Sequence, residues 1–318
     1  MFSKEYLQKM SRQTGFLADS LQKQMTLLDL LREISRHPLL GKKFALKGGT
    51  AINLFWFPMP RLSVDIDLNY VASADRDTML NDRPLLEKEL KKLIESRGIS
   101  VEHALADEHA GGKWRLRAPS AFGGHFTLEI DLNYLMRMPV FGIHSKRPYE
   151  LDEDYTFEFD SVAFEELFGG KIKALLERSA TRDLYDVSML AKTSVRYDME
   201  GIRKVGILFG VTSKRDWRTV DFRTIDEIDQ QMINAELTPL VRQNETPSLD
   251  VMKSDARNIL TTILEYKENE KKFLDQFLDQ GQYNPDLLFE AKEAERLKNH
   301  PAVLWKLRNL RKFKGLEY

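Results

Sequence analysis

Two nearly identical acidic segments are the feature of this sequence best suited to chemistry. Residues 65–70 read Asp-Ile-Asp-Leu-Asn-Tyr, and residues 129–134 read Glu-Ile-Asp-Leu-Asn-Tyr. On a strand, this alternation places the carboxylates on one face and the isoleucine and leucine on the other. Acidic residues are poor strand formers, so their presence needs a cause, and a bound divalent cation is the usual one. Magnesium prefers one or two carboxylates with waters and phosphate oxygens, so the segments predict a phosphate–metal site.

A glycine turn precedes the first acidic segment. The turn reads Lys47-Gly48-Gly49-Thr50, and one short apolar helix separates it from Arg61-Leu62-Ser63-Val64-Asp65-Ile66-Asp67. Glycines at a strand-to-helix turn let backbone N–H groups approach a phosphate, and Thr50 and Ser63 add hydroxyl donors. Asp65 and Asp67 would hold the metal against those phosphates. The alternative is a tight loop with Thr50 as a helix N-cap, followed by an acidic edge strand. The two features together favour nucleotide chemistry.

Asp131 is the predicted third carboxylate. It takes the place of Asp67 in the second segment. A two-metal phosphoryl-transfer site needs such a group on a neighbouring strand, either to complete metal coordination or to activate an attacking hydroxyl. Glu129 is either a further ligand or an exposed strand acid. Taken alone, the second segment is equally compatible with a solvated strand face.

A basic cluster follows in the second half of the chain. Lys171, Arg178 and Arg182 are seven and four residues apart, so on one helix they would form a basic stripe suited to triphosphate or RNA phosphates. Asp183 and Asp186 are three residues apart and could pair with this stripe. The alternative is an ion-paired helix surface.

The elements that must position these residues follow from apolar spacing and turn signals. Residues 4–36 predict helix with a break near Gly15, and residues 85–97 predict a helix that ends at Gly98. Glycine pairs at 111–112 and 123–124 predict a hairpin that ends in the second acidic segment. Further helices are expected over residues 184–192, 225–237, 249–275, 284–297 and 302–313. The expected class is α+β, with an α/β domain with N-terminal helices over 1–155 and a helical domain over 156–318.

Composition narrows the class of protein. The chain has 318 residues, 48 basic against 49 acidic, so no overall positive charge indicates nucleic-acid binding, and any basic surface must be local. Cysteine is absent, which excludes disulfides, thiolate metal sites and a cysteine nucleophile. The first residues lack the apolar core of a signal peptide, and no apolar stretch is long enough to span a bilayer. The expected location is the cytoplasm.

Four sequence blocks together resemble a known family. They are Lys47-Gly48-Gly49-Thr50-Ala51, Arg61-x-Ser63-x-Asp65-Ile66-Asp67-Leu68, Lys171-x-x-Ala174-Leu175-x-x-Arg178 and Arg182-Asp183-x-Tyr185-Asp186. This combination, between about residues 44 and 190, resembles the AbiEii family of nucleotidyltransferase toxins, including the MenT-type proteins. The resemblance implies a DNA polymerase β-like nucleotidyltransferase domain with a mixed sheet, and a helical C-terminal domain that completes the active-site cleft. It also implies toxin action in a toxin–antitoxin operon linked to phage defence, with nucleotide transfer to tRNA acceptor ends in some members.

The resemblance also implies residue roles. Gly49 with Thr50 or Ser63 would contact the nucleotide phosphates, Asp65 and Asp67 would bind Mg²⁺ or Mn²⁺, Lys171 would neutralise triphosphate charge, and Asp186 would be a second catalytic acid or the base. The other predicted nucleotide-binding residues are Lys47, Gly48, Arg61, Arg178 and Arg182. Two departures stand out. The polymerase-type Gly-Ser pair is Gly49-Thr50 here or is split with Ser63, and Gly169-Gly170 replaces an expected Ala-Glu, which would loosen the helix that carries Lys171.

The predicted function is a magnesium-dependent nucleotidyltransferase toxin that moves a nucleoside monophosphate from an NTP to RNA, with tRNA acceptor ends as the expected target. One alternative is a kinase that moves a γ-phosphate to a protein or small molecule. Another is a nucleotide- or RNA-binding module without turnover. A two-metal nuclease is less favoured, because it would leave the glycine turn idle. The expected partners are an NTP, RNA and a cognate antitoxin. No association with a membrane is expected.

Overall fold

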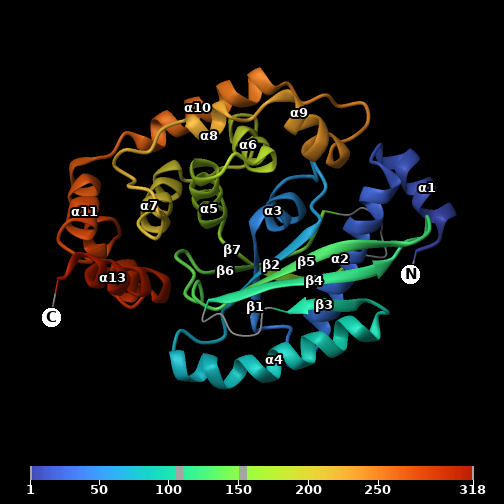
Figure 1. Cartoon of the computed structure of the whole chain (residues 1–318), viewed down its shortest axis with the longest axis horizontal. Coiled ribbons are helices and arrows are strands. Elements are labelled where there is room, and N and C mark those ends of the chain that lie inside the picture. The colour runs from blue at the N-terminus through green and yellow to red at the C-terminus, as the bar shows by residue number, and fades with distance from the viewer. Residues whose placement is uncertain (1, 105–109, 150–155, 317–318) are drawn as a thin grey trace. The chain divides into compact units, whose positions relative to one another are not determined.

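The two acidic segments are neighbouring strands of one sheet. A computed structural model of the chain describes residues 2–104, 110–149 and 156–316, and within these ranges the sheet has seven strands in the order β3-β4-β5-β2-β1-β7-β6 (Figure 1). The strands are β1 (Phe44–Lys47), β2 (Asp65–Tyr70), β3 (Ser100–Ala104), β4 (Gly111–Pro119), β5 (His125–Asn133), β6 (Ile143–Lys146) and β7 (Phe159–Val162). β2–β5 and β1–β7 pair parallel and the others pair antiparallel, so the expected mixed sheet is confirmed.

The chain divides into two compact units. The first consists of Met1–Arg137, Ile143–Val162 and Asn234–Pro247, and the second of Met138–Gly142, Ala163–Ile233 and Ser248–Tyr318. The domain boundary expected at residue 155 lies outside the described residues.

The first unit holds the whole sheet and the N-terminal helices. These helices are α1 (Lys4–Thr14), α2 (Ala18–Arg36), α3 (Gly48–Ala51), which a π-helix (Ile52–Trp56) continues, and α4 (Arg76–Ser96). The expected break at Gly15 is confirmed, because Gly15 ends α1 in the left-handed conformation with φ 79°. α2 contacts β5 and β7, and α4 contacts β3, so both helices lie along the sheet (Figure 1).

α4 begins nine residues before the predicted start at Leu85, so that prediction is wrong. Asp75 caps the helix, and its carboxylate accepts a hydrogen bond from the backbone N–H of Thr78 at 2.8 Å. Met79 is buried on the same side as later helix residues, and the helix runs through Pro84. Capping and burial therefore outweigh the tendency of an internal proline to end a helix.

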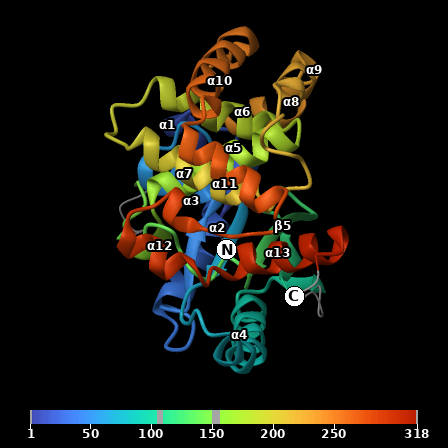
Figure 2. The same ribbon diagram turned by 90° about the vertical axis from the view of Figure 1, so that its left-hand side faces the viewer.

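The second unit contains helices and no strand among its described residues. Its helices are α5 (Phe164–Glu177), α6 (Thr181–Ser188), α7 (Met199–Gly210), α8 (Arg223–Asp226), α9 (Gln230–Met232), α10 (Leu249–Leu264), α11 (Glu268–Leu278), α12 (Ala291–Leu297) and α13 (Pro301–Lys314). α5 contacts α6, α7 and α8, and Figure 2 gives a second view of these helices. Within the described ranges, no helix is both long enough and apolar enough to cross a bilayer.

Three of the long helices expected in the second half of the chain are interrupted. The segment 225–237 breaks where Asp229 caps α9, and 284–297 breaks between the short 3₁₀ turn Pro285–Leu287 and α12. The segment 249–275 breaks before α11, where Glu270 accepts a hydrogen bond from the backbone N–H of Lys267 at 2.7 Å. Apolar spacing continues across these breaks, so the sequence pattern did not show them. The helix expected over 302–313 is confirmed as α13.

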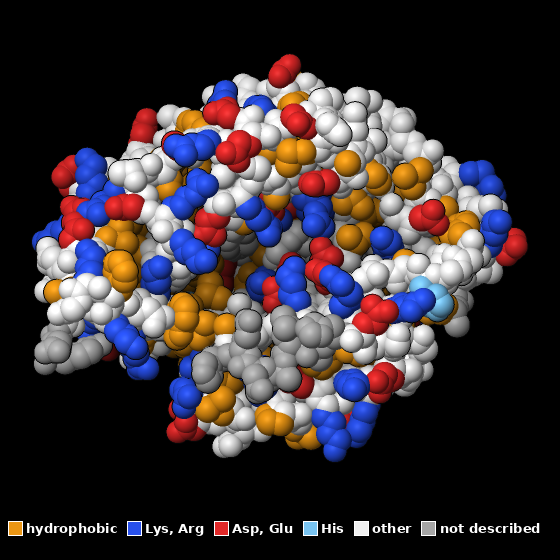
Figure 3. Space-filling model, in the orientation of Figure 1, with side chains coloured by type: hydrophobic (Ala, Val, Ile, Leu, Met, Phe, Trp, Pro, Cys, Tyr) orange, Lys and Arg blue, Asp and Glu red, His pale blue; other side chains and the backbone are white. Residues whose placement is uncertain are grey.

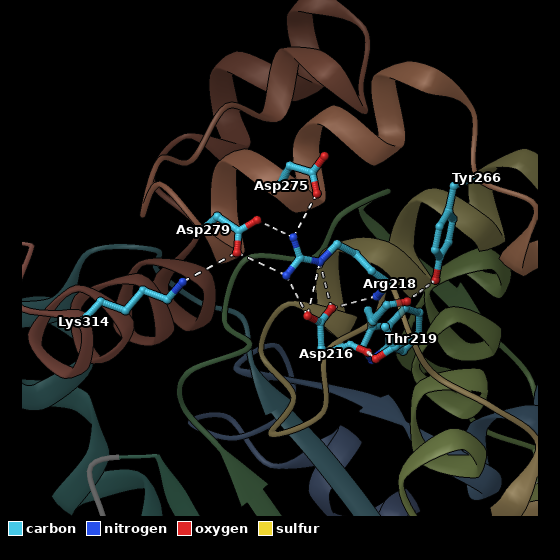
Figure 4. Close-up of polar contacts among 8 residues, drawn as sticks. Asp216, Arg218, Thr219, Tyr266, Asp275, Asp279 and Lys314 are labelled. Atoms are coloured by element: carbon cyan, nitrogen blue, oxygen red, sulfur yellow. Dashed lines mark hydrogen bonds and ion pairs between the residues drawn. The ribbon is translucent and has the colours of Figure 1, made fainter.

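Arg218 joins separate segments of the second unit in a surface ion-pair network (Figure 4). Its guanidinium lies 2.7 Å from Asp216 and 2.9 Å from Asp275, and it also contacts Asp279. Lys314 of α13 lies 3.6 Å from Asp279. Exposed ion pairs each contribute little, so this network orients the loop after α7 against α11 more than it stabilises the unit.

Glu166 is a buried carboxyl of the second unit. It lies in the first turn of α5, is 3% exposed, and accepts a hydrogen bond from the backbone N–H of Val140 at 2.6 Å. Burial raises the pKa of Glu166 to about 7, although the hydrogen bonds from Val140 and Phe141 and the charge of Arg296 oppose this rise. The folded state therefore favours the protonated acid.

This raised pKa predicts a pH-dependent stability. The contribution of protonated Glu166 to the free energy of unfolding is present in full below the usual pKa of 4.5. It is lost as the pH rises through 7. We expect the free energy of unfolding, measured by urea titration, to fall by up to about 3 kcal/mol more in the parent than in Glu166→Gln across this interval. Glu165→Gln, at the neighbouring and partly exposed position, is the control and should keep the parent's pH dependence. Equal pH dependence in the parent and Glu166→Gln would contradict the prediction.

Candidate active site

One face of the sheet carries charged side chains in register across four adjacent strands. Directly opposite residues of neighbouring strands share a face, as do residues two apart on one strand. The first row, from β1 through β2 and β5 to β4, is Lys47, Asp67, Asp131 and Lys113. The second row, from β2 through β5 to β4, is Asp65, Glu129 and Arg115. We call Asp65, Asp67, Glu129 and Asp131 the acid face. The opposite face of β2 is apolar, and its Ile66 and Leu68 are buried.

The acid face brings together carboxylates that repel one another. Asp67 lies directly opposite Asp131, and such like-charge pairs on neighbouring strands are destabilising. Basic residues offset part of this cost: Lys113 Nζ lies 3.0 Å from Glu129 Oε2, and Lys47 Nζ lies 4.0 Å from Asp67 Oδ1. The hydrogen bond to Glu129 raises the pKa of Lys113, and the charges of Asp131 and Asp65 also raise it, against the opposing effect of burial. Lys113 is therefore a firmly charged neighbour of the carboxylates.

Gly48 lets the carboxylate of Asp67 lie against the backbone of the turn. Its φ is 71°, in the left-handed region that side-chain-bearing residues rarely adopt. A Cβ at this position would lie 2.1 Å from Asp67 Oδ2, which is a steric clash. The next residue, Gly49, is buried, and its carbonyl oxygen accepts a hydrogen bond from Asn53 Nδ2 at 2.8 Å. The glycine turn and the first acidic strand are thus in direct contact.

We expect Gly48→Ala to lower the nucleotide-transfer activity predicted from the sequence by about 10²-fold, because a shift of about 1 Å in a positioned group has an effect of this size. Gly98→Ala is the matched control. Gly98 has φ 73° and open space around its Cβ position, so the two variants share the backbone strain of about 1–2 kcal/mol but only one displaces Asp67. Urea unfolding and turnover, measured on both variants, separate the effects. Equal loss of turnover in the two variants would show that strain alone is responsible.

The hydroxyls of Thr50 and Ser63 lie together at the start of β2. Thr50 is 1% exposed and Ser63 is 4% exposed, and their Oγ atoms are 2.8 Å apart. Thr50 also donates a hydrogen bond to the carbonyl oxygen of Asp65, so it anchors the start of β2 to the turn. Contact of either hydroxyl with a phosphate stays a prediction. The alternative reading of this region is wrong on both counts, because Thr50 lies inside α3 rather than at its N-cap, and β2 is a central strand.

Arg61, a predicted nucleotide-binding residue, is 1% exposed inside the first unit. One guanidinium nitrogen donates a hydrogen bond to the carbonyl oxygen of Leu62 at 2.9 Å, and the backbone N–H of Leu62 donates to the carbonyl of Leu240 at 2.8 Å. The visible role of Arg61 is therefore to support the segment that leads into β2. Its contact with a nucleotide stays a prediction.

The predicted basic stripe is not formed, because its members lie on two helices. α5 ends at Glu177, Arg178 follows in an extended conformation, and Arg182 belongs to α6. Gly169 does not loosen α5, which is continuous. Instead, a Cβ at Gly169 would lie 2.5 Å from Val205 Cγ1, so the glycine permits close packing of α5 against α7.

Lys171 forms a buried ion-pair network in the second unit. Its ammonium lies 2.6 Å from Asp183 and 3.0 Å from Asp186, and Arg178 lies 2.8 Å from the other oxygen of Asp183. Both aspartates are 1% exposed and Lys171 is 8% exposed. Burial raises the pKa of Asp183, but the charges of Lys171 and Arg178 outweigh it and lower the pKa to about 2. The roles of Lys171, Arg178, Arg182 and Asp186 toward a nucleotide stay predictions.

The acid face fits the donor chemistry of Mg²⁺. Asp65, Asp67 and Asp131 offer carboxylate oxygens, the hard ligands that Mg²⁺ or Mn²⁺ prefers. In the part of the chain that the structure describes, no group of three or more His, Cys, Asp or Glu side chains is arranged to hold a metal by itself. Magnesium usually binds through one or two carboxylates together with waters and substrate phosphates, so a complete protein cage is not required. A cation would also offset the repulsion between Asp67 and Asp131.

Three basic residues beside the acid face were missed by sequence reasoning. Lys113, Arg115 and Arg117 lie on β4, and their side chains are 62%, 61% and 51% exposed. Trp114 and Leu116 alternate with them and are buried on the opposite face. The hairpin predicted from the glycine pairs is confirmed, because β4 pairs antiparallel with β5. The Lys-Trp-Arg-Leu-Arg alternation within that hairpin was the available signal for these three residues.

The comparisons with known proteins agree with this architecture. The family model described as "Nucleotidyl transferase AbiEii toxin, Type IV TA system" matches residues 29–262. The solved structure of MenT4, a nucleotidyltransferase toxin from Mycobacterium tuberculosis H37Rv, is similar over 98% of this chain and 99% of that chain, with a TM-score of 0.67 and 16% sequence identity. At this identity the likeness shows the fold, which is the one the sequence predicted. No curated protein gives a significant sequence match.

Proposed function

This chain belongs to the AbiEii family of nucleotidyltransferase toxins, and we propose that it transfers a nucleoside monophosphate from an NTP to RNA in a Mg²⁺-dependent reaction. The observation that carries the proposal is the register of β2 and β5, which sets Asp67 beside Asp131 and against the Gly48 turn. A phosphate-approaching turn and a row of carboxylates are the two parts that phosphoryl transfer requires, because the chemistry needs mainly positioning and electrostatic stabilisation.

The residues of the first unit take distinct roles in this proposal. Lys47 and the backbone of Gly48 and Gly49 position the triphosphate, and Asp65 and Asp67 hold the cation. Magnesium supplies the positive charge that stabilises the transferring phosphate. Asp131 either completes the coordination or accepts the proton of the attacking hydroxyl. The acceptor oxygen bonds to the α-phosphorus as the bond to the α,β-bridging oxygen breaks, and pyrophosphate leaves.

We further propose tRNA as the acceptor class, growth inhibition in the cytoplasm as the outcome, and a cognate antitoxin as the protein partner, in line with MenT4 being a nucleotidyltransferase toxin. These points rest on family membership. An unchanged growth rate on expression of the parent chain without a neighbouring antitoxin gene would contradict the growth-inhibition part.

Incubation with α-labelled or γ-labelled NTPs and total RNA tests the reaction. We expect label on RNA from one or more α-labelled NTPs and none from γ-labelled NTPs, with loss of the signal when the divalent cation is chelated. Label transferred from γ-labelled NTP would favour the kinase reading. Absence of RNA label with all four α-labelled NTPs would overturn the proposal.

A further inference from the structure

We propose that β4 is a binding track for the phosphates of the RNA acceptor, with Lys113, Arg115 and Arg117 as its contacts. This inference rests on the proposed function and assigns the acceptor to one side of the acid face.

The pairing of the strands carries the inference. β1, β2, β5 and β4 are consecutive in the sheet, so a basic residue of β1, two acidic strands and three basic residues of β4 follow one another across a single face. Lys47 marks the β1 side, next to the glycine turn that suits the triphosphate. The β4 side offers positive charge on the other flank of the same carboxylates, so we assign to this flank the acceptor that brings the attacking hydroxyl.

The geometry of β4 suits a phosphate backbone. Side chains two residues apart on a strand are spaced by about 6.8 Å, which is close to the spacing of consecutive phosphates in an extended nucleic-acid strand. Arg115 and Arg117 bring planar guanidinium groups, which bind phosphate oxygens in pairs. All three side chains are more than half exposed, and buried Trp114 and Leu116 anchor the strand from the other face.

Binding of RNA phosphates by Lys113, Arg115 and Arg117 depends on local charge, because the chain as a whole has a net charge of −1. On the face of the molecule in Figure 3, basic and acidic side chains are interspersed, so attraction of a polyanion must come from local groups. Lys113 and Arg115 share one acid, Glu129, at 3.0 and 4.0 Å, and Arg117 lies 3.6 Å from Glu102. Asp131, directly opposite Lys113, and Asp65 add negative charge beside these residues. A cation held by Asp65 and Asp67 would offset this charge and leave the basic side chains of β4 to attract a phosphate.

The test compares two triple variants. Lys113→Gln, Arg115→Gln and Arg117→Gln remove the track. The control removes three basic residues of α4 that are equally exposed and also paired with acids, Arg76→Gln, Lys91→Gln and Lys92→Gln, whose side chains are 67%, 53% and 58% exposed. Binding of end-labelled, unfractionated tRNA is measured over a range of salt concentrations, with duplex DNA as competitor. The KM values for tRNA and for NTP are measured on the same proteins.

We expect the track variant to bind tRNA at least roughly tenfold more weakly and to lower the slope of log K against log salt by about 2, because each phosphate contact to a single strand contributes about 0.7. Its KM for tRNA should rise while its KM for NTP stays at the parent value, and the α4 control should match the parent. Equal loss in both triple variants, or an unchanged tRNA slope in the track variant, would overturn the inference. The binding arm needs no turnover, so it decides the inference even where the labelling experiment fails.

Discussion

Asp67→Asn is expected to lower the turnover number for nucleotide transfer by about 10²–10³-fold, the usual effect of removing one electrostatic group from a phosphoryl-transfer site. The substitution keeps the shape of the side chain and removes its charge. It also relieves the repulsion from Asp131, which lies directly opposite on β5. The free energy of unfolding should therefore stay constant or rise by up to ~1 kcal/mol. Activity and stability would move in opposite directions, as expected where a charge is kept for function at the expense of stability.

Asp160→Asn is the control for this prediction. Asp160 is a strand carboxylate of the same sheet, but it lies on β7, which β1 separates from β2, and it pairs with Lys42 at 3.1 Å. It should retain parent turnover. Turnover is measured with the α-labelled NTP and unfolding with urea. Parent-like turnover in Asp67→Asn, or a loss of stability large enough to account for the loss of turnover, would remove the acid face from the mechanism.

Lys171→Met is expected to lower the free energy of unfolding of the chain by about 3–5 kcal/mol, because it leaves two buried carboxylates without their shared cation. Asp183 and Asp186 are each 1% exposed, so water cannot replace the ammonium. The pKa of Asp183 is about 2, below its usual 3.8, so the contribution of this network is present above about pH 4 and is lost as the pH falls through 2. Urea unfolding near neutral pH therefore measures the network in full.

Lys173→Met supplies the comparison on the same helix. Lys173 pairs with Glu177 at 2.8 Å, one turn along a partly exposed surface, and such pairs contribute about 0.3–0.5 kcal/mol. Lys173→Met should thus be nearly as stable as the parent. If Lys171→Met keeps parent stability and loses only activity, the ammonium serves the triphosphate rather than the network, as the family resemblance implied.

The sequence was sufficient to identify the residues of the acid face but not their arrangement. Period-two alternation showed that Asp65 and Asp67 share a face, and the repeat pointed to Asp131. Their alignment depends on the parallel pairing of β2 with β5. The alternation of residues within one strand carries no information about which strand it pairs with. The hairpin of β4 with β5 was predicted from its glycine pairs, but the basic residues of β4 gained their meaning only once β5 was known to lie beside β2.

Elements with weak patterns were missed or misjudged for local reasons. β6 (Ile143–Lys146) has four residues that are largely exposed, so no apolar face marked it as a strand. The stripe expected from Lys171 to Arg182 failed because spacing was counted through residues 178–180, where the chain leaves the helix between α5 and α6. The predicted pairing of Asp183 and Asp186 with a basic residue is confirmed for Lys171, but these residues are buried, so the alternative of an ion-paired helix surface is wrong.

The parallel pairing of β2 with β5 also bears on the order in which the protein folds. β1 with β2, and β3 through β5, pair with strands close to them in the sequence, whereas β2 and β5 are separated by α4, β3 and β4. Non-local pairings form late, because closing a long loop is entropically unfavourable before other contacts compensate for it. Asp67 lies on β2 and Asp131 on β5, so the repulsion between their carboxylates opposes this late pairing. A partly synthesised or partly folded chain therefore has the sequence motifs of the family without the proposed catalytic arrangement, and the proposed activity would require this pairing to be complete.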